Sequence, residues 1–269
     1  MSKGDRTIEV TTSQINSFKN CRKKFWFSYR ELLKPVKESE ALETGSSYHA
    51  KVEEILKTGN FTESMDKTDA MARAFIKYIL PKLPQNIEPE VEFKYRLARG
   101  IYLKGKIDGI CNDYLIEHKT TSAKVDDKYL YRVNFMNDQV SNYLIATGKN
   151  IPILYTVIQK PTIKLKKTET LEEYIQRCEE WYDTDTDTKI NVFEVYRTDE
   201  ELIEKKKELL EFAKEIKKTD KNKFFYRNDQ ACMILGCEFS SICNSYNCAS
   251  NLVDFYKKEV ANEELKGEF

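Results

Sequence analysis

Residues 101–121 read IYLKGKIDGICNDYLIEHKTT, and this stretch decides the fold. Polar and apolar residues alternate on both sides of a turn-forming Asn-Asp pair, and the preceding segment EVEFKYRLA (90–98) alternates in the same way before an Arg-Gly pair. Alternation with a period of two indicates strands with one buried face, and short polar turns between such strands indicate antiparallel pairing. We therefore predict a three-stranded antiparallel meander.

Helical patterns flank this meander. Apolar spacing, capping residues and breakers predict the following elements: a helix from Thr11 that runs through Cys21, helices over 45–59 and 66–80, the meander, a helix over 135–147, a buried strand over 151–160, an irregular polar segment over 161–190, a strand over 191–198 and an amphipathic helix over 199–218. The order of helix, three strands, helix and strand predicts an α/β fold around a central mixed sheet.

The composition fits one large globular domain. The chain has 269 residues, of which 33% are charged and 41% hydrophobic, so extensive disorder is excluded. Its 44 basic and 44 acidic residues cancel, and a nucleic-acid site must therefore come from local clustering of charge. We expect a single domain over 1–269, with an N-terminal helical part (1–85), a core (86–200) and a C-terminal helix and cysteine-rich segment (201–269).

The cellular location follows from two absences in the sequence. No apolar run approaches the ~20 residues that a membrane span needs, and the first residues, MSKGDRTIEV, lack the apolar stretch of a signal peptide. We expect a cytoplasmic protein with no membrane partner, in a compartment where thiols stay reduced. The seven cysteines therefore need an explanation other than disulfides.

Three ionisable residues of the meander fit hydrolytic chemistry. Asp108 and Glu117 lie on neighbouring strands, and Lys119, two residues after Glu117, points to the same face. Adjacent carboxylates repel unless a cation joins them, and oxygen ligands suit Mg²⁺ or Mn²⁺, which polarise phosphoryl oxygens. Lys119 then orients the attacking water or stabilises the charge that grows on the phosphate. The alternative is an exposed ion pair between Glu117 and Lys119 on a strand surface.

GKID followed by EHKT resembles the PD-(D/E)XK nuclease superfamily, specifically its RecB-like branch. In that branch a glycine precedes the aspartate, as Gly105 does here. The branch lacks the proline that names the superfamily, and Ile107 stands at that position here. The resemblance implies a restriction-endonuclease-like core of helix, three antiparallel strands, helix and strand. It also implies a divalent-metal-dependent DNA exonuclease that cleaves single-stranded DNA ends in recombination, repair or adaptation of a defence system, in a bacterial or virus-infected bacterial cell. Asp108, Glu117 and Lys119 are its catalytic residues.

Two further motifs carry the same resemblance. GSSYHAKVEE is similar to the helix whose histidine binds the metal in the RecB-like branch, so His49 joins Asp108 and Glu117 as an expected ligand. DQVSNYLIATG is similar to the Q-x-x-x-Y motif that contacts the DNA strand, which makes Gln139 and Tyr143 the expected nucleic-acid-binding residues. His118 alternates to the face opposite Glu117, and we do not expect its ring to bind the metal.

The cysteines of ACMILGCEFSSICNS suggest a metal centre. Cys232, Cys237 and Cys243 are closely spaced, and either Cys248 or the distant Cys21 can supply a fourth thiolate. RecB-like nucleases with an iron–sulfur cluster, such as the CRISPR-associated exonucleases, have one cysteine before the core and three after it. This resemblance implies Cys21 and a [4Fe–4S] cluster. Structural Zn²⁺ and plain reduced cysteines are the alternatives, and we expect Cys111 and Cys178 to serve packing.

Two other functions stay open at this point. The chain could be a DNA-end-binding or scaffolding module of a larger complex with weak catalysis, or it could be a nuclease that acts on RNA, since no residue can be recognised as a reader of the 2′-hydroxyl. No G-x-x-x-x-G-K-[ST] phosphate loop occurs in the sequence. Any unwinding of DNA must therefore come from another chain, and we expect a helicase or a recombination protein as a partner in trans.

Overall fold

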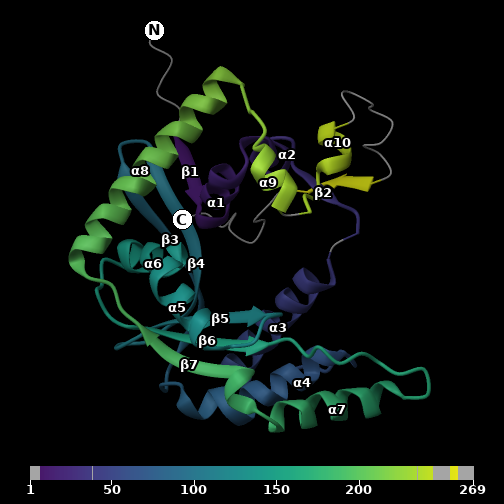
Figure 1. The fold of residues 1–269 in the computed structure, drawn as a ribbon. Coiled ribbons are helices and arrows are strands. Elements are labelled where there is room, and N and C mark those ends of the chain that lie inside the picture. Colours follow the sequence, from purple (N-terminus) through teal and green to yellow (C-terminus); the bar gives the residue numbers. More distant parts are fainter. Residues whose placement is uncertain (1–6, 38, 235, 245–254, 260–269) are drawn as a thin grey trace.

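A computed structural model describes residues 7–37, 39–234, 236–244 and 255–259 (Figure 1). A mixed six-stranded sheet forms the centre of the molecule, which confirms the predicted α/β fold. Its strands are β1 (Ile8–Thr11), β3 (Glu88–Ala98), β4 (Ile101–Ile110), β5 (Leu115–Thr121), β6 (Ile153–Gln159) and β7 (Ile190–Val195).

The directions of the strands confirm the meander. β3 pairs with β4 and β4 with β5 in antiparallel fashion, then β6 runs parallel to β5 and β7 antiparallel to β6. Every residue of β6 is buried, as its apolar sequence predicts. β1 was not predicted, and it pairs in parallel with the first four residues of β4.

The helices cover both faces of the sheet. Their bounds are α1 (Thr12–Asn20), α2 (Arg22–Tyr29), α3 (Glu40–Thr58), α4 (Lys67–Ala74), the π-helical turn η1 (Phe75–Ile79), the 3-10 turn η2 (Leu80–Lys82), α5 (Asp127–Met136), α6 (Asp138–Thr147), α7 (Leu171–Asp183), the 3-10 turn η3 (Thr186–Thr188) and α8 (Asp199–Asn222). Adjacent residues of β6 enter different apolar clusters: Val157 packs with α5 and α6, and Ile158 packs with α3, α4 and η1. The sheet therefore separates two cores.

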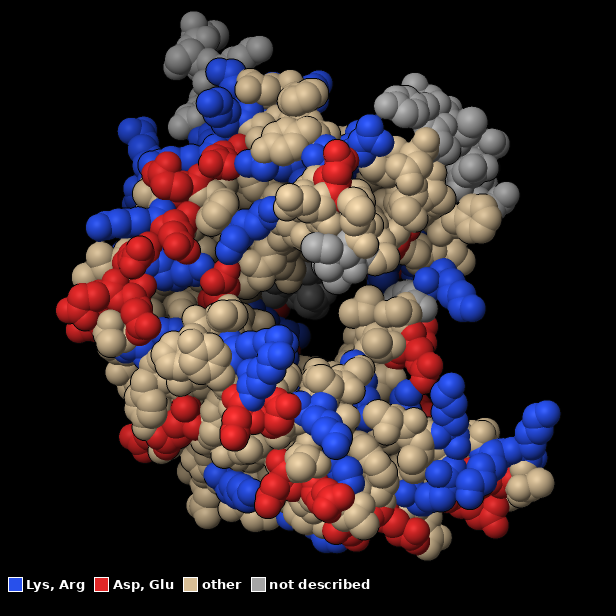
Figure 2. Space-filling view, viewed as in Figure 1, with Lys and Arg blue, Asp and Glu red and all other residues tan. Residues whose placement is uncertain are grey.

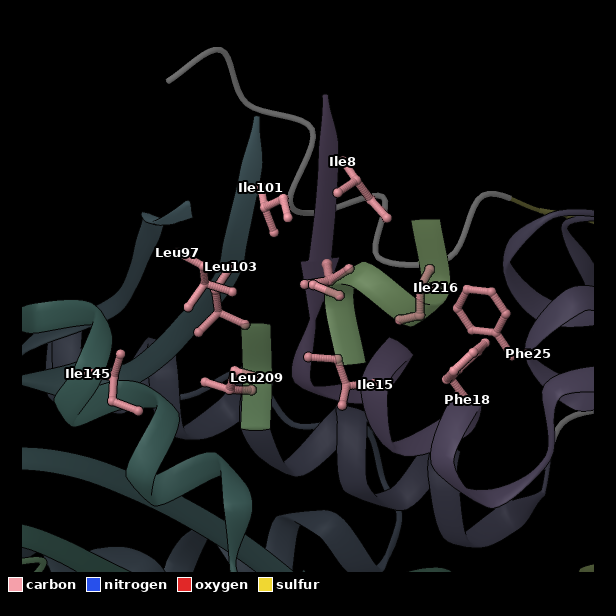
Figure 3. Packing of buried hydrophobic residues seen from close by; sticks show 12 residues of the cluster. Ile8, Ile15, Phe18, Phe25, Leu97, Ile101, Leu103, Ile145, Leu209 and Ile216 are labelled. Atoms are coloured by element: carbon pink, nitrogen blue, oxygen red, sulfur yellow. The ribbon is translucent and has the colours of Figure 1, made fainter. Parts of the chain in front are cut away.

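A third core joins the N-terminal elements to α8. α1 and α8 pack over β1 and the first half of β4, and the apolar side chains between them are shown in Figure 3: Ile8, Ile15, Phe18, Phe25, Leu97, Ile101, Leu103, Ile145, Leu209 and Ile216. Thr11 caps α1 as expected, because its hydroxyl accepts a hydrogen bond from the backbone N–H of Gln14.

Three predicted boundaries were wrong. The first helix breaks at Cys21, whose backbone is extended (φ −157°, ψ 116°), because the next segment turns to donate a hydrogen bond from the Lys23 N–H to the Tyr226 carbonyl. The helix predicted over 135–147 is two helices, separated at Asn137, which caps α6. The segment predicted as irregular contains α7, which begins with a capping box made by Thr170 and Glu173.

The C-terminal segment packs against the N-terminal helices. It comprises α9 (Asp229–Ile234), α10 (Ser240–Asn244) and β8 (Tyr256–Lys258), and β8 pairs antiparallel with β2 (Leu33–Pro35). Phe239 and Tyr256 stack on each other and pack with Phe27 of α2. Within the ranges that the structure covers, no helix is long and apolar enough to span a membrane.

The absence of a side chain at Gly105 leaves room for the aromatic ring of Phe93, the residue that pairs with it on β3. A Cβ atom at this position would lie 2.5 Å from the Phe93 ring, which packs edge-to-face on Tyr143. We expect Gly105→Ala to lower the free energy of unfolding by about 1–3 kcal/mol, because the ring must move. Thermal or urea unfolding measures the change.

Gly45→Ala in α3 is the matched control. Its added Cβ would meet only the Thr120 hydroxyl at 3.5 Å, an ordinary contact, and alanine favours a helix over glycine. Equal stability of the two variants would contradict the steric argument.

Candidate functional site

The site lies where one edge of β4 divides between two partners. On this edge β1 pairs with Ile101 to Lys104, and β5 pairs with Gly109 and Ile110. Asp108 lies just before the second pairing, and its Oδ2 atom accepts a hydrogen bond from the backbone N–H of His118, at 2.7 Å. The carboxylate thus takes the place of a main-chain acceptor, which fixes its position between β4 and β5.

A second network links β5 to α6. Glu117 is fully buried, and its Oε1 atom forms an ion pair with the Lys119 ammonium. Lys119 also donates to Gln139 Oε1 at 3.1 Å, and the Gln139 amide lies 3.4 Å from Glu117 Oε2 and 2.5 Å from the Tyr143 hydroxyl. The structure therefore brings together the predicted catalytic and nucleic-acid-binding residues of these two elements.

The expected histidine lies beside Asp108. His49 on α3 places its Nδ1 atom 3.8 Å from Asp108 Oδ2. Among the described residues, the one group of three or more possible ligands with donor atoms within 4.8 Å of one another is His49, Glu90 and Asp108. Imidazole nitrogen and carboxylate oxygens together suit Mn²⁺ or Mg²⁺. Glu117 is outside this group and is held by Lys119 and Gln139.

Glu90 is the residue that the sequence analysis missed. Ala98 pairs with Ile101 at the turn, and if β3 and β4 continued in that register, Val91 would lie opposite Asp108. A register shift between Arg96 and Ala98 instead places position 90 opposite position 108. Glu90 has a left-handed backbone (φ 59°), and its carboxylate is 2.5 Å from the Lys106 ammonium.

Burial controls the protonation of the carboxylates. It raises the pKa of Asp108 to about 6, an effect that Lys119 and the His118 N–H oppose. Burial, followed by the charge of Asp108, raises the pKa of Glu117 to about 7. Burial lowers the pKa of His49, and so does the charge of Lys119. The site thus favours a neutral imidazole, and its carboxylates are ionised only with a cation nearby or at a pH above their pKa values.

His118 and Tyr143 turn away from solvent. The His118 Nδ1 atom lies 2.7 Å from the Thr156 hydroxyl, and the ring packs edge-to-face on Phe75, away from the Lys119–Gln139 network. Only 2% of Tyr143 is exposed, so its ring has no open face for a base, and its hydroxyl accepts a hydrogen bond from the Gln139 amide.

Comparison with solved structures found proteins that are named as exonucleases. A protein from Eubacterium rectale that is named as an exonuclease matches with a TM-score of 0.52 and 15% identity, over 98% of this chain and 94% of that one. A phage-related exonuclease from Haemophilus somnus 129PT matches with a TM-score of 0.42 and 13% identity (81% and 96% covered). An alkaline exonuclease from Laribacter hongkongensis matches with a TM-score of 0.36 and 13% identity, over 80% of this chain and 92% of that one.

No protein-family model and no curated protein sequence matches the chain. The similarity to the Eubacterium rectale protein extends over nearly the whole of both chains. Together with the order of the core elements, it defines a restriction-endonuclease-like fold, as the sequence predicts.

We expect Mn²⁺ to stabilise the protein more at pH 8 than at pH 5.5. The native pKa values of about 6 and 7 lie above the usual ~4 of the unfolded chain, so the metal-free protein loses stability as pH rises through this window. A cation binds the ionised carboxylates and offsets this loss, and saturating Mn²⁺ at pH 8 should raise the melting temperature by about 5 °C or more. Thermal unfolding with and without Mn²⁺ measures both effects.

Glu90→Gln should weaken this response, because it removes one charged ligand without changing the shape of the side chain. Glu92→Gln is the matched control, since Glu92 lies on the same strand with its side chain exposed. A Mn²⁺ shift that is the same at both pH values, or unchanged in Glu90→Gln, would contradict the assigned ligands.

Proposed function

We propose that the protein is a divalent-metal-dependent DNA exonuclease that acts on single-stranded DNA ends. One observation carries the proposal: the donor atoms of His49, Glu90 and Asp108 converge beside the ion pair between the buried Glu117 and the partly exposed Lys119. This arrangement provides ligands for a hard cation and a cationic side chain next to them. Figure 2 shows that this face of the molecule is hollowed near its centre, and we propose that a strand end enters there.

Each side chain has a role in phosphodiester hydrolysis. Asp108, His49 and Glu90, with Glu117 beside them, would hold Mg²⁺ or Mn²⁺, which polarises a phosphoryl oxygen when bound. Lys119, fixed by Glu117 and Gln139, orients the attacking water and stabilises negative charge on the phosphate. The Gln139 amide is held by Tyr143 and contacts the strand near the scissile bond.

Lys119→Ala should reduce cleavage of single-stranded DNA at least 10³-fold, since it removes the group that positions water and offsets charge. DNA binding should change little, whereas the melting temperature should fall because Glu117 loses its cationic partner, and the assay is therefore run well below that temperature. The assay follows labelled single-stranded DNA, duplex DNA and RNA of the same sequence with Mg²⁺ or Mn²⁺. Lys57→Ala on the exposed side of α3 is the control.

Undiminished metal-dependent cleavage by Lys119→Ala would refute its assigned role. A wild-type protein that binds DNA ends without cutting them would instead be an end-binding module. Faster cleavage of the RNA strand would reassign the substrate.

We also propose that Cys21, Cys232, Cys237 and Cys243 hold a [4Fe–4S] cluster. Cys232 lies on α9, Cys243 on α10 and Cys237 between these helices, close to the α1–α2 junction, where Cys21 interrupts the helix. Burial raises the pKa of Cys243, and the nearby thiols of Cys21 and Cys232 raise it further, as expected when several thiols gather. Cys248, the other possible ligand, lies outside the described residues. Such a cluster would bind the C-terminal segment to the N-terminal helices.

Protein purified without oxygen should be brown and contain about four irons per chain. Cys237→Ser should lose the colour and most of the iron. Cys111→Ser, in the turn that follows β4, should retain both. Stoichiometric zinc in a colourless protein would identify a Cys₄ zinc site instead.

A further inference from the structure

Helix α5 presents two aromatic rings to solvent. Tyr131 and Phe135 are 58% and 63% exposed and lie one helical turn apart, with ring centroids 4.7 Å apart and planes inclined by 41°. Met136 extends the same apolar surface and is 69% exposed. Single exposed apolar side chains are common, but adjacent rings on one short helix form a patch that indicates a binding surface.

Basic residues accompany these rings. Lys128 and Arg132 are exposed and, at helical spacing, lie on the same outward side of α5 as Tyr131 and Phe135. In the part of the chain that the structure describes, neither forms an ion pair. Rings interleaved with cations complement a polyanion that carries flat π surfaces. They fit a protein partner less well, because covering unpaired cations costs desolvation free energy.

The opposite side of α5 belongs to the candidate site. Val133 packs in the same core as Tyr143 and Val157, and Tyr129 lies close enough to Lys119 for that charge to act on its hydroxyl. Beyond α5, Asn137 caps the helix that carries Gln139. Figure 2 shows basic and uncharged side chains next to each other over α5, at the rim of the hollow. The patch and the candidate site therefore lie on opposite sides of the same short helix.

We propose that this outward face of α5 is a stacking platform for the bases of a single DNA strand whose end lies in the candidate active site. Tyr131 and Phe135 stack on successive bases, and Lys128 and Arg132 contact the phosphates between them. This assignment rests on the proposed nuclease function, and it supplies the open ring faces that the buried Tyr143 does not offer.

The test measures binding of labelled single-stranded DNA by fluorescence anisotropy, with Ca²⁺ in place of Mg²⁺ to limit cleavage. Tyr131→Ala/Phe135→Ala should weaken binding about 10- to 100-fold, because each stacked base contributes substantially to affinity. The Mn²⁺-dependent rise in melting temperature should stay at the wild-type value. Tyr196→Ala, which removes a ring that is 60% exposed beyond β7, should bind as the wild type does.

Three further double variants separate stacking from other modes of binding. Tyr131→Trp/Phe135→Trp should keep the affinity, and Tyr131→Leu/Phe135→Leu should lose it, because leucine retains apolar area without a π face. Lys128→Ala/Arg132→Ala should reduce the slope of log affinity against log salt by about 1.4, since each of the two phosphate contacts on a single strand contributes ~0.7.

Each contrary result has its own meaning. If the wild type binds and cleaves DNA but the alanine or leucine double variant binds equally well, the platform is refuted and the nuclease proposal stands. If the wild type neither binds nor cleaves single strands, both proposals fail. If light scattering shows a wild-type dimer that the alanine variant abolishes without loss of DNA affinity, the patch is a contact between two copies and the platform is refuted.

Discussion

The hydrogen bond from the His118 N–H to the Asp108 carboxylate holds the candidate site together. β4 changes partner along one edge, from β1 to β5, and a side chain rather than the main chain makes the connection at the point of change. A carboxylate in that place is directed by the sheet itself, so its position does not depend on a mobile loop. The donor atoms of His49 from α3 and Glu90 from β3 lie within 4.8 Å of this carboxylate.

Electrostatics explains why the site is assembled from opposite charges. Asp108 and Glu117 are buried near each other, which favours their neutral forms. Lys119 offsets part of this cost, and the two carboxylates keep its ammonium charged despite burial, since they raise its pKa. A divalent cation would offset the remainder. The same imbalance that destabilises the metal-free site therefore provides affinity for a hard cation.

Local patterns in the sequence were sufficient for most of the core. Alternation predicted β3, β4 and β5, uniform apolar character predicted β6, and the resemblance to a Q-x-x-x-Y motif singled out Gln139 and Tyr143. Features that depend on distant contacts were not predictable. The break at Cys21 follows from the carbonyl of Tyr226, some two hundred residues away, and β1 is too short to stand out before β4 provides its partner. Glu90 was missed because one bulge shifts the register of the hairpin.

The left-handed backbone of Glu90 has an evolutionary consequence. A residue with a branched Cβ or a long side chain in this conformation costs ~1 kcal/mol or more, and glycine there would relieve it. Replacement by glycine would thus favour folding while it deletes a carboxylate from the cluster. Selection for stability alone would therefore favour glycine over glutamate at this position.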